Sequence, residues 1–132
     1  MIHTNLILCI DDDEDDLEML ATSFNQHVPE FEIITCNSGE SGLEKLVSLK
    51  NHNMVPNLIV LDINMPRMDG RETLHQIRAV REWASIPIVI FSTSSSPIDQ
   101  TYFKERGVAY LIKPVDMDKF REAVQHLLSY CK

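Results

Sequence analysis

Leu58-Ile59-Val60-Leu61-Asp62 is a run of four apolar residues that ends in an acidic one. A strand without alternating polar residues is typical of the interior of a parallel sheet, where both faces are covered. We therefore predict a central strand over residues 58–61. Asp62 then lies at its carboxyl end, which is the end at which open parallel sheets bind their ligands.

Four further segments, on either side of this run, are short and rich in apolar or β-forming residues. Stretches with apolar residues at helical spacing separate them, so the chain alternates between strand and helix. Five such β-α units predict an α/β fold with a parallel sheet and helices on both of its faces. The other predicted strands are Leu6–Ile10, Phe31–Cys36, Ile86–Phe91 and Val108–Ile112.

The predicted helices follow these strands one by one. Pro29 stops the first helix, and a polar connection, Asn51–Pro56, follows the second. Ser96 and Pro97 are typical of a helix start, and Gly107 is expected to close that fourth helix with a left-handed backbone. The apolar positions that define the other helices are Leu17, Leu20, Ala21, Phe24 and Val28; Leu43, Leu46 and Val47; Leu74 and Ile77, with Trp83; and Phe120, Ala123, Val124, Leu127, Leu128 and Cys131.

The composition narrows the class of protein. A length of 132 residues predicts one domain, 1–132, with no room for an output domain after the last helix. Twenty acidic and twelve basic residues give a net charge of −8, which argues against direct binding of nucleic acid. Three widely spaced cysteines predict reduced thiols in a cytoplasmic protein, and no segment is predicted to span or enter a membrane.

The residues that follow the predicted strands are polar and chemically complementary. Asp11, Asp12 and Asp13 follow the first strand, Asp62 the third, Ser92 and Thr93 the fourth, and Lys113 the fifth. Carboxylates that converge in a cleft repel one another unless a cation neutralises them, and oxygen ligands favour Mg²⁺ or Ca²⁺ over zinc. The lysine suits an anionic group on the same metal, and phosphate is the simplest candidate.

Four motifs together resemble the signature of the response-regulator receiver domains of two-component systems. They are Ile10-Asp11-Asp12, the segment from Leu61 to Gly70 that reads Leu-Asp-Ile-Asn-Met-Pro-Arg-Met-Asp-Gly, Ser92, and Tyr110-Leu111-Ile112-Lys113-Pro114. The resemblance covers nearly the whole chain and implies a flavodoxin-like, doubly wound sheet of strand order 2-1-3-4-5. The single-domain form and Gly70-Arg71-Glu72 also resemble the small regulators that partner phytochrome-type kinases.

The resemblance implies a role for each motif residue. Asp62 would be the phosphoacceptor, Asp12 and Asp62 would bind Mg²⁺ together with the Asn64 carbonyl, and Asp11 would act through a water. The phosphoryl oxygens would be contacted by Lys113 and by Ser92, and Tyr110 would be the aromatic switch residue. The Lys113–Pro114 peptide bond would be cis.

The same resemblance implies the activity and the partners. The phosphoryl donor would be a histidine kinase or phosphotransfer protein, and slow autodephosphorylation would be the only other chemistry, so the protein would not be an enzyme in the usual sense. The protein would be a monomer or a homodimer modulated by phosphorylation.

Two other interpretations start from the acidic run at residues 11–16. An EF-hand is excluded because Asp16 and Thr22 stand where its loop needs glycine and glutamate. A haloacid-dehalogenase-like phosphatase, with Asp11 as nucleophile and Asp13 as acid/base, is the enzyme alternative, but it leaves Asp62 and Ser92 unexplained. A third interpretation, a degenerate receiver that only binds partners, has no support because every signature position is filled.

Overall fold

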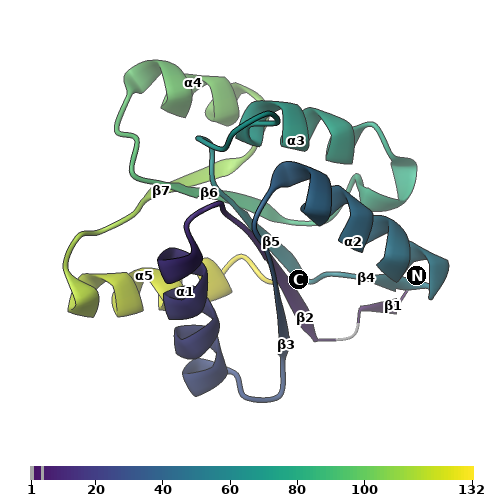
Figure 1. The fold of residues 1–132 in the computed structure, drawn as a ribbon, viewed down its shortest axis with the longest axis horizontal. Helices are drawn as coiled ribbons and strands as arrows, with labels where there is room; N and C mark the ends of the chain where they lie inside the picture. Colours follow the sequence, from purple (N-terminus) through teal and green to yellow (C-terminus); the bar gives the residue numbers. More distant parts are fainter. Residues whose placement is uncertain (1, 4) are drawn as a thin grey trace.

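A five-stranded parallel sheet forms the centre of the computed structural model, which describes residues 2–3 and 5–132. Its strands lie in the order β3-β2-β5-β6-β7 (Figure 1). Counted along the chain within this sheet, the order is 2-1-3-4-5, which confirms the predicted fold. The strands are β2 (Leu6–Ile10), β3 (Glu32–Cys36), β5 (Leu58–Leu61), β6 (Ile88–Ser92) and β7 (Ala109–Ile112).

Five α-helices cover the two faces of the sheet. Residues of α1 and α5 pack in one core layer, while residues of α2, α3 and α4 pack in the other (Figure 1). The helices are α1 (Glu14–His27), α2 (Gly39–Asn51), α3 (Gly70–Arg78), α4 (Pro97–Glu105) and α5 (Met117–Leu128).

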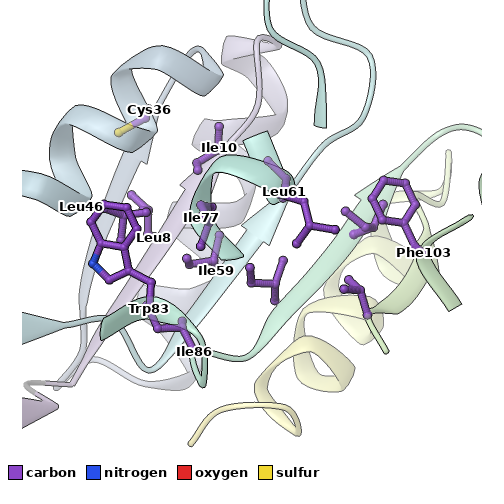
Figure 2. Packing of buried hydrophobic residues seen from close by; sticks show 14 of the residues in the cluster. Leu8, Ile10, Cys36, Leu46, Ile59, Leu61, Ile77, Trp83, Ile86 and Phe103 are labelled. Carbon is purple, nitrogen blue, oxygen red and sulfur yellow. The ribbon is translucent and has the colours of Figure 1, made fainter. Parts of the chain in front are cut away.

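Strand β2 shows why the sheet is covered on both sides. Leu8 and Ile10 point toward the layer of α2, α3 and α4 (Figure 2). Ile7 and Cys9 pack in the layer of α1 and α5, as the two-residue period of a strand requires. All five residues of β2 are buried, so an all-apolar run is the expected sequence.

The start of α4 follows the predicted capping chemistry. Ser96 caps α4 by accepting a hydrogen bond from the Asp99 N–H, and Pro97 is the first helical residue. Gly107 has a φ of 71°, which confirms the predicted left-handed residue after this helix. The N-cap of α1 is Asp13, whose carboxylate accepts from the Asp16 N–H.

Several predicted boundaries were wrong. Some differ by one residue: β3 begins at Glu32, β7 begins at Ala109, and β6 ends at Ser92. Trp83 does not extend α3: the chain becomes extended at Val80, and Trp83 ends a short 3-10 turn, η1 (Arg81–Trp83), although its ring is buried in the core (Figure 2). Strand β6 begins at Ile88 and not at Ile86, since Pro87 has no N–H to donate to a ladder. Helix α5 ends at Leu128, so Cys131 lies beyond it.

The connection between residues 51 and 56 is more ordered than a polar loop. It contains β4 (Met54–Val55), which pairs in parallel with β1 (Ile2–His3). Next to it, the buried Asn57 side chain accepts a hydrogen bond from the Leu6 N–H (2.8 Å) and donates one to the Lys132 carbonyl (3.1 Å). Asn57 therefore joins the start of β2 to the carboxyl end of the described chain.

The expectation of a cis peptide bond at Lys113–Pro114 was also wrong. The described residues contain no cis peptide bond. The trans form is the intrinsic preference before proline, by about 0.5–1 kcal/mol.

Among residues 2–3 and 5–132, no helix has the length and apolar character needed to cross a membrane.

Candidate functional site

The carboxyl ends of four neighbouring strands bring the predicted site residues to one edge of the sheet. Asp11 follows β2 and Asp62 follows β5, and the Asp62 N–H donates to the Ile10 carbonyl at 3.0 Å. Ser92 ends β6, and its carbonyl accepts from the Lys113 N–H at 2.7 Å just beyond β7. Parallel pairing thus places residues that are up to 102 positions apart in one site.

Three carboxylates form the acidic part of the site. One oxygen from each of Asp11, Asp12 and Asp62 lies within 4.8 Å of the others. Asp11 and Asp62 are buried, whereas Asp12 is exposed. This donor set fits a hard divalent cation such as Mg²⁺, which prefers carboxylate, carbonyl and water oxygens.

The electrostatics of the acidic group support the same conclusion. Burial, with the neighbouring Asp11 charge, raises the pKa of Asp62 to about 7. Burial also raises the pKa of Asp11, against the hydrogen bonds it accepts from Lys113 and from the Asp13 N–H. A divalent cation between the carboxylates would favour their charged forms, as at a metal site.

Lys113 provides the positive charge of the site and is almost fully buried. Its Nζ lies 2.6 Å from Asp11 Oδ2, 2.7 Å from Asp16 Oδ2 and 3.8 Å from Asp62 Oδ2. Burial alone lowers the pKa of Lys113, but its bonds to Asp11 and Asp16 outweigh that effect and raise it to about 12. Lys113 is therefore charged at neutral pH.

Asp16 and Gly70 are site residues to which the sequence analysis gave no role. Asp16 belongs to the acidic run 11–16. The position of this run after an apolar strand was the only feature of the sequence that could have pointed to Asp16 as a site residue. At Gly70 a Cβ atom would lie 2.4 Å from the Asp62 carbonyl oxygen, and the Gly70 N–H donates to the Ile63 carbonyl at 2.7 Å. Only glycine lets α3 start this close to the loop that carries Asp62.

Asp13 and Asn64 lie outside the cluster of three carboxylates. Asp13 is an exposed N-cap residue, and its own N–H donates to Asp11 Oδ1 at 3.0 Å. A capping carboxylate explains Asp13 fully, without an acid/base role. Asn64 lies in the loop after Asp62 and is exposed, and the part assigned to its carbonyl in metal binding stays a prediction.

Ser92 and Tyr110 lie on adjacent strands behind the site. Ser92 is fully buried, and its hydroxyl accepts a hydrogen bond from the Ser94 N–H at 3.2 Å. The half-buried Tyr110 donates its hydroxyl to the Ser94 carbonyl at 2.8 Å. The two predicted switch residues are therefore joined through one loop residue, Ser94.

Comparisons with known proteins agree with this geometry. A family model for the response regulator receiver domain matches residues 7–125. The nitrate/nitrite response regulator protein NarL of Escherichia coli K12 is 35% identical over 115 residues, which are 83% of this chain and 50% of NarL. The chain spans half or less of the length of several curated relatives that it matches.

Two solved structures have the same fold. The phosphorylated cyanobacterial phytochrome response regulator RcpA is 24% identical, with a TM-score of 0.86 over 97% of this chain and 96% of RcpA. The Mn²⁺-bound form of response regulator Rcp1 is 28% identical, with a TM-score of 0.81 over 95% of this chain and 92% of Rcp1.

The comparisons also bear on the choice between the interpretations left open by the sequence. The phosphatase alternative finds no support in them, since the family model that matches residues 7–125 is that of the receiver domain. The chain belongs to the response regulator receiver family, whose members are phosphorylation-dependent signalling switches.

Proposed function

We propose that this protein accepts a phosphoryl group on Asp62 in the presence of Mg²⁺ and changes its partner-binding surface as a result. The observation that carries the proposal is the buried Asp62 carboxylate, which has Asp11 and Asp12 within 4.8 Å and the Lys113 ammonium at 3.8 Å. A nucleophile, a cation site and a fixed positive charge are the parts that phosphoryl transfer needs.

Asp62 is the nucleophile of the proposed reaction. A carboxylate oxygen of Asp62 attacks the phosphorus of a phosphohistidine on the donor protein. The P–N bond breaks, and the imidazole nitrogen of the donor histidine keeps the electron pair. Asp12, Asp62 and the Asn64 carbonyl would hold Mg²⁺, with Asp11 acting through a water, and the bound ion would neutralise charge on the phosphoryl oxygens. Lys113 and the Ser92 hydroxyl would bind those oxygens once the acyl phosphate has formed.

A histidine kinase or phosphotransfer protein is the donor class that fits this chemistry, because its phosphohistidine supplies a reactive P–N bond. Water later hydrolyses the acyl phosphate slowly, so turnover of a separate substrate is not part of the function. Cys9 and Cys36 are free and buried, which supports a reducing, cytoplasmic location. We propose a monomer or a homodimer modulated by phosphorylation.

Intact-mass measurement after incubation with acetyl phosphate tests the proposal. With Mg²⁺ we expect one added phosphoryl group, mapped to Asp62; with a chelator, or in Asp62→Asn, we expect none. The matched control is Asp13→Asn, which keeps the helix cap because asparagine caps as well as aspartate. Labelling should persist in it. A phosphoryl group on Asp11 would refute the proposal and favour the phosphatase alternative.

A further inference from the structure

The ammonium group of Lys113 is shared unequally among three carboxylates. Asp11 and Asp16 accept its hydrogen bonds at 2.6 and 2.7 Å, whereas Asp62 lies 3.8 Å away. An ammonium group has three N–H donors, and two of them are engaged by the closer carboxylates. The lysine that would bind the phosphoryl group is thus held toward the first turn of α1.

Asp16 is held firmly where it meets Lys113. It lies in the first turn of α1, and its N–H donates to Asp13 Oδ1 at 3.1 Å. Asp13 is in turn tied to Asp11 by a backbone-to-carboxylate bond of 3.0 Å. Asp11, Asp13 and Asp16 are therefore linked by hydrogen bonds, which accounts for three of the six acidic residues that follow the apolar strand.

The pair between Asp16 and Lys113 is shielded from water. The side chains of Lys113 and Asp16 are 6% and 19% exposed. A shielded ion pair is less screened than a surface pair, so its loss has a larger effect on the position of the lysine. Asp16 is also not one of the three carboxylates that could hold the metal, so it is free to act on the lysine alone.

We propose that Asp16 is a positioning residue that competes with the phosphoryl group for Lys113. In the unphosphorylated protein it holds the ammonium away from Asp62, and phosphorylation has to exchange this carboxylate for phosphoryl oxygens. Its negative charge opposes the incoming anion as well, so both effects act in the same direction. Asp16 then limits how readily Asp62 is phosphorylated; the inference rests on the proposed function.

Beryllofluoride, which mimics a phosphoryl group on aspartate, is the probe. Its affinity at saturating Mg²⁺ is measured by NMR titration for the wild type, Asp16→Asn and Asp15→Asn. We expect Asp16→Asn to bind about tenfold more tightly, which corresponds to about 1.4 kcal/mol. Asp15→Asn is the matched control. Asp15 lies in the same turn and is exposed, and its substitution removes the same charge. Its affinity should stay within about twofold of the wild type, as expected for a screened surface charge.

Two further measurements separate positioning from a purely structural role. Asp16→Glu, which keeps the charge, should bind beryllofluoride with an affinity close to that of the wild type. In the wild type, the Asp16 carboxylate ¹³C resonance should shift on beryllofluoride binding while that of Asp15 does not, and this needs no variant to fold.

Several results would overturn the inference without touching the proposed function. They are equal affinity in Asp16→Asn and the wild type, an equal gain in Asp15→Asn, or an unmoved Asp16 resonance in a protein that binds the probe. A wild type that neither binds beryllofluoride nor accepts a phosphoryl group contradicts the proposed function itself.

Discussion

Asp12 is the exposed member of the acidic group, and it offers the clearest test of the metal site. The repulsion among Asp11, Asp12 and Asp62, which Lys113 offsets only in part, opposes folding when no cation is bound. Mg²⁺ should therefore raise the melting temperature of the wild type by binding only the folded state. The free energy of unfolding should increase by about 1–3 kcal/mol when the Mg²⁺ concentration is well above the dissociation constant.

Asp12→Asn should lose most of this Mg²⁺ effect, and its metal-free form should be as stable as the wild type or more so. Thermal unfolding with and without Mg²⁺ measures both. Asp118→Asn, at an exposed carboxylate on α5, is the control and should respond to Mg²⁺ like the wild type. Equal Mg²⁺ stabilisation in Asp12→Asn would mean that the ion binds elsewhere.

At the scale of single residues, the sequence could predict the positions that lie at strand ends. Asp11, Asp62, Ser92 and Lys113 follow from apolar runs and from the rule that parallel strands end together. The contact between Asp16 and Lys113 could not be predicted, because it depends on which way a long side chain leans between residues 97 positions apart. The Lys113–Pro114 bond was wrongly predicted for a similar reason, since the local sequence permits both forms.

At the scale of elements, α3, α4 and the loop after β6 are joined by a polar chain. Arg71, in the first turn of α3, forms an ion pair with Asp99 in the first turn of α4. Asp99 also accepts a hydrogen bond from the Ser94 hydroxyl at 2.6 Å, and the Ser94 carbonyl accepts from Tyr110. The ion pair therefore holds in place the loop that contains Ser94, the residue that is hydrogen-bonded to both Ser92 and Tyr110.

Arg71→Ala should release this loop and the start of α4. We expect faster amide exchange over residues 94–100 and a loss of stability on the order of 1 kcal/mol, as for a partly exposed ion pair. Arg106→Ala is the matched control, because both guanidinium groups lie over the Tyr102 ring, with Cζ 4.9 Å (Arg71) and 3.5 Å (Arg106) from its centroid. Only Arg71 also pairs with Asp99. Equal exchange in the two variants would show that stacking on Tyr102 matters and the ion pair does not.

The long elements could be predicted from the sequence, and the short ones could not. Most of the five helices and the five strands of the main sheet carry a periodic or continuous apolar pattern, whereas α4 was predicted from Ser96 and Pro97 at its start and Gly107 after its end. The pairing of β1 with β4 involves two residues in each strand, too few for any period to appear. Trp83 follows Ile77 closely enough to suggest a longer α3, but the extended backbone at Val80 ends the helix and tertiary packing buries the ring in another way.

At the scale of the whole molecule, apolar side chains are exposed near the edge of the sheet formed by β7. β7 is the edge strand next to β6 and lies between α4 and α5 (Figure 1). Ile98 on α4, Ile112 at the end of β7, and Val115 and Met117 beyond it are all exposed. Exposed apolar residues gathered on neighbouring elements are typical of interaction surfaces. We expect partners to bind this surface, made by α4, β7 and α5.

We expect Tyr110 to connect this surface to the site. Phosphorylation of Asp62 would offer new oxygens near Lys113, and a Ser92 hydroxyl drawn toward them would give up its bond from the Ser94 N–H. Ser94 carries the carbonyl that holds the Tyr110 hydroxyl, so a change at Ser92 reaches the ring through one residue. An aromatic ring with two positions is the kind of two-state element that a switch requires.

The beryllofluoride complex should therefore show NMR shift changes concentrated in residues 92–116 and in α5, in addition to those beside Asp62. Tyr110→Phe keeps the ring but loses the bond to the Ser94 carbonyl, so it separates the site from the surface. In this variant the changes near Asp62 should persist, while those in β7 and α5 should shrink, because the loop no longer holds the ring in one position. If the wild-type changes cluster instead on α1, over residues 17–24, the output surface lies on that helix and Tyr110 only packs against Phe103, whose ring centroid is 6.1 Å away.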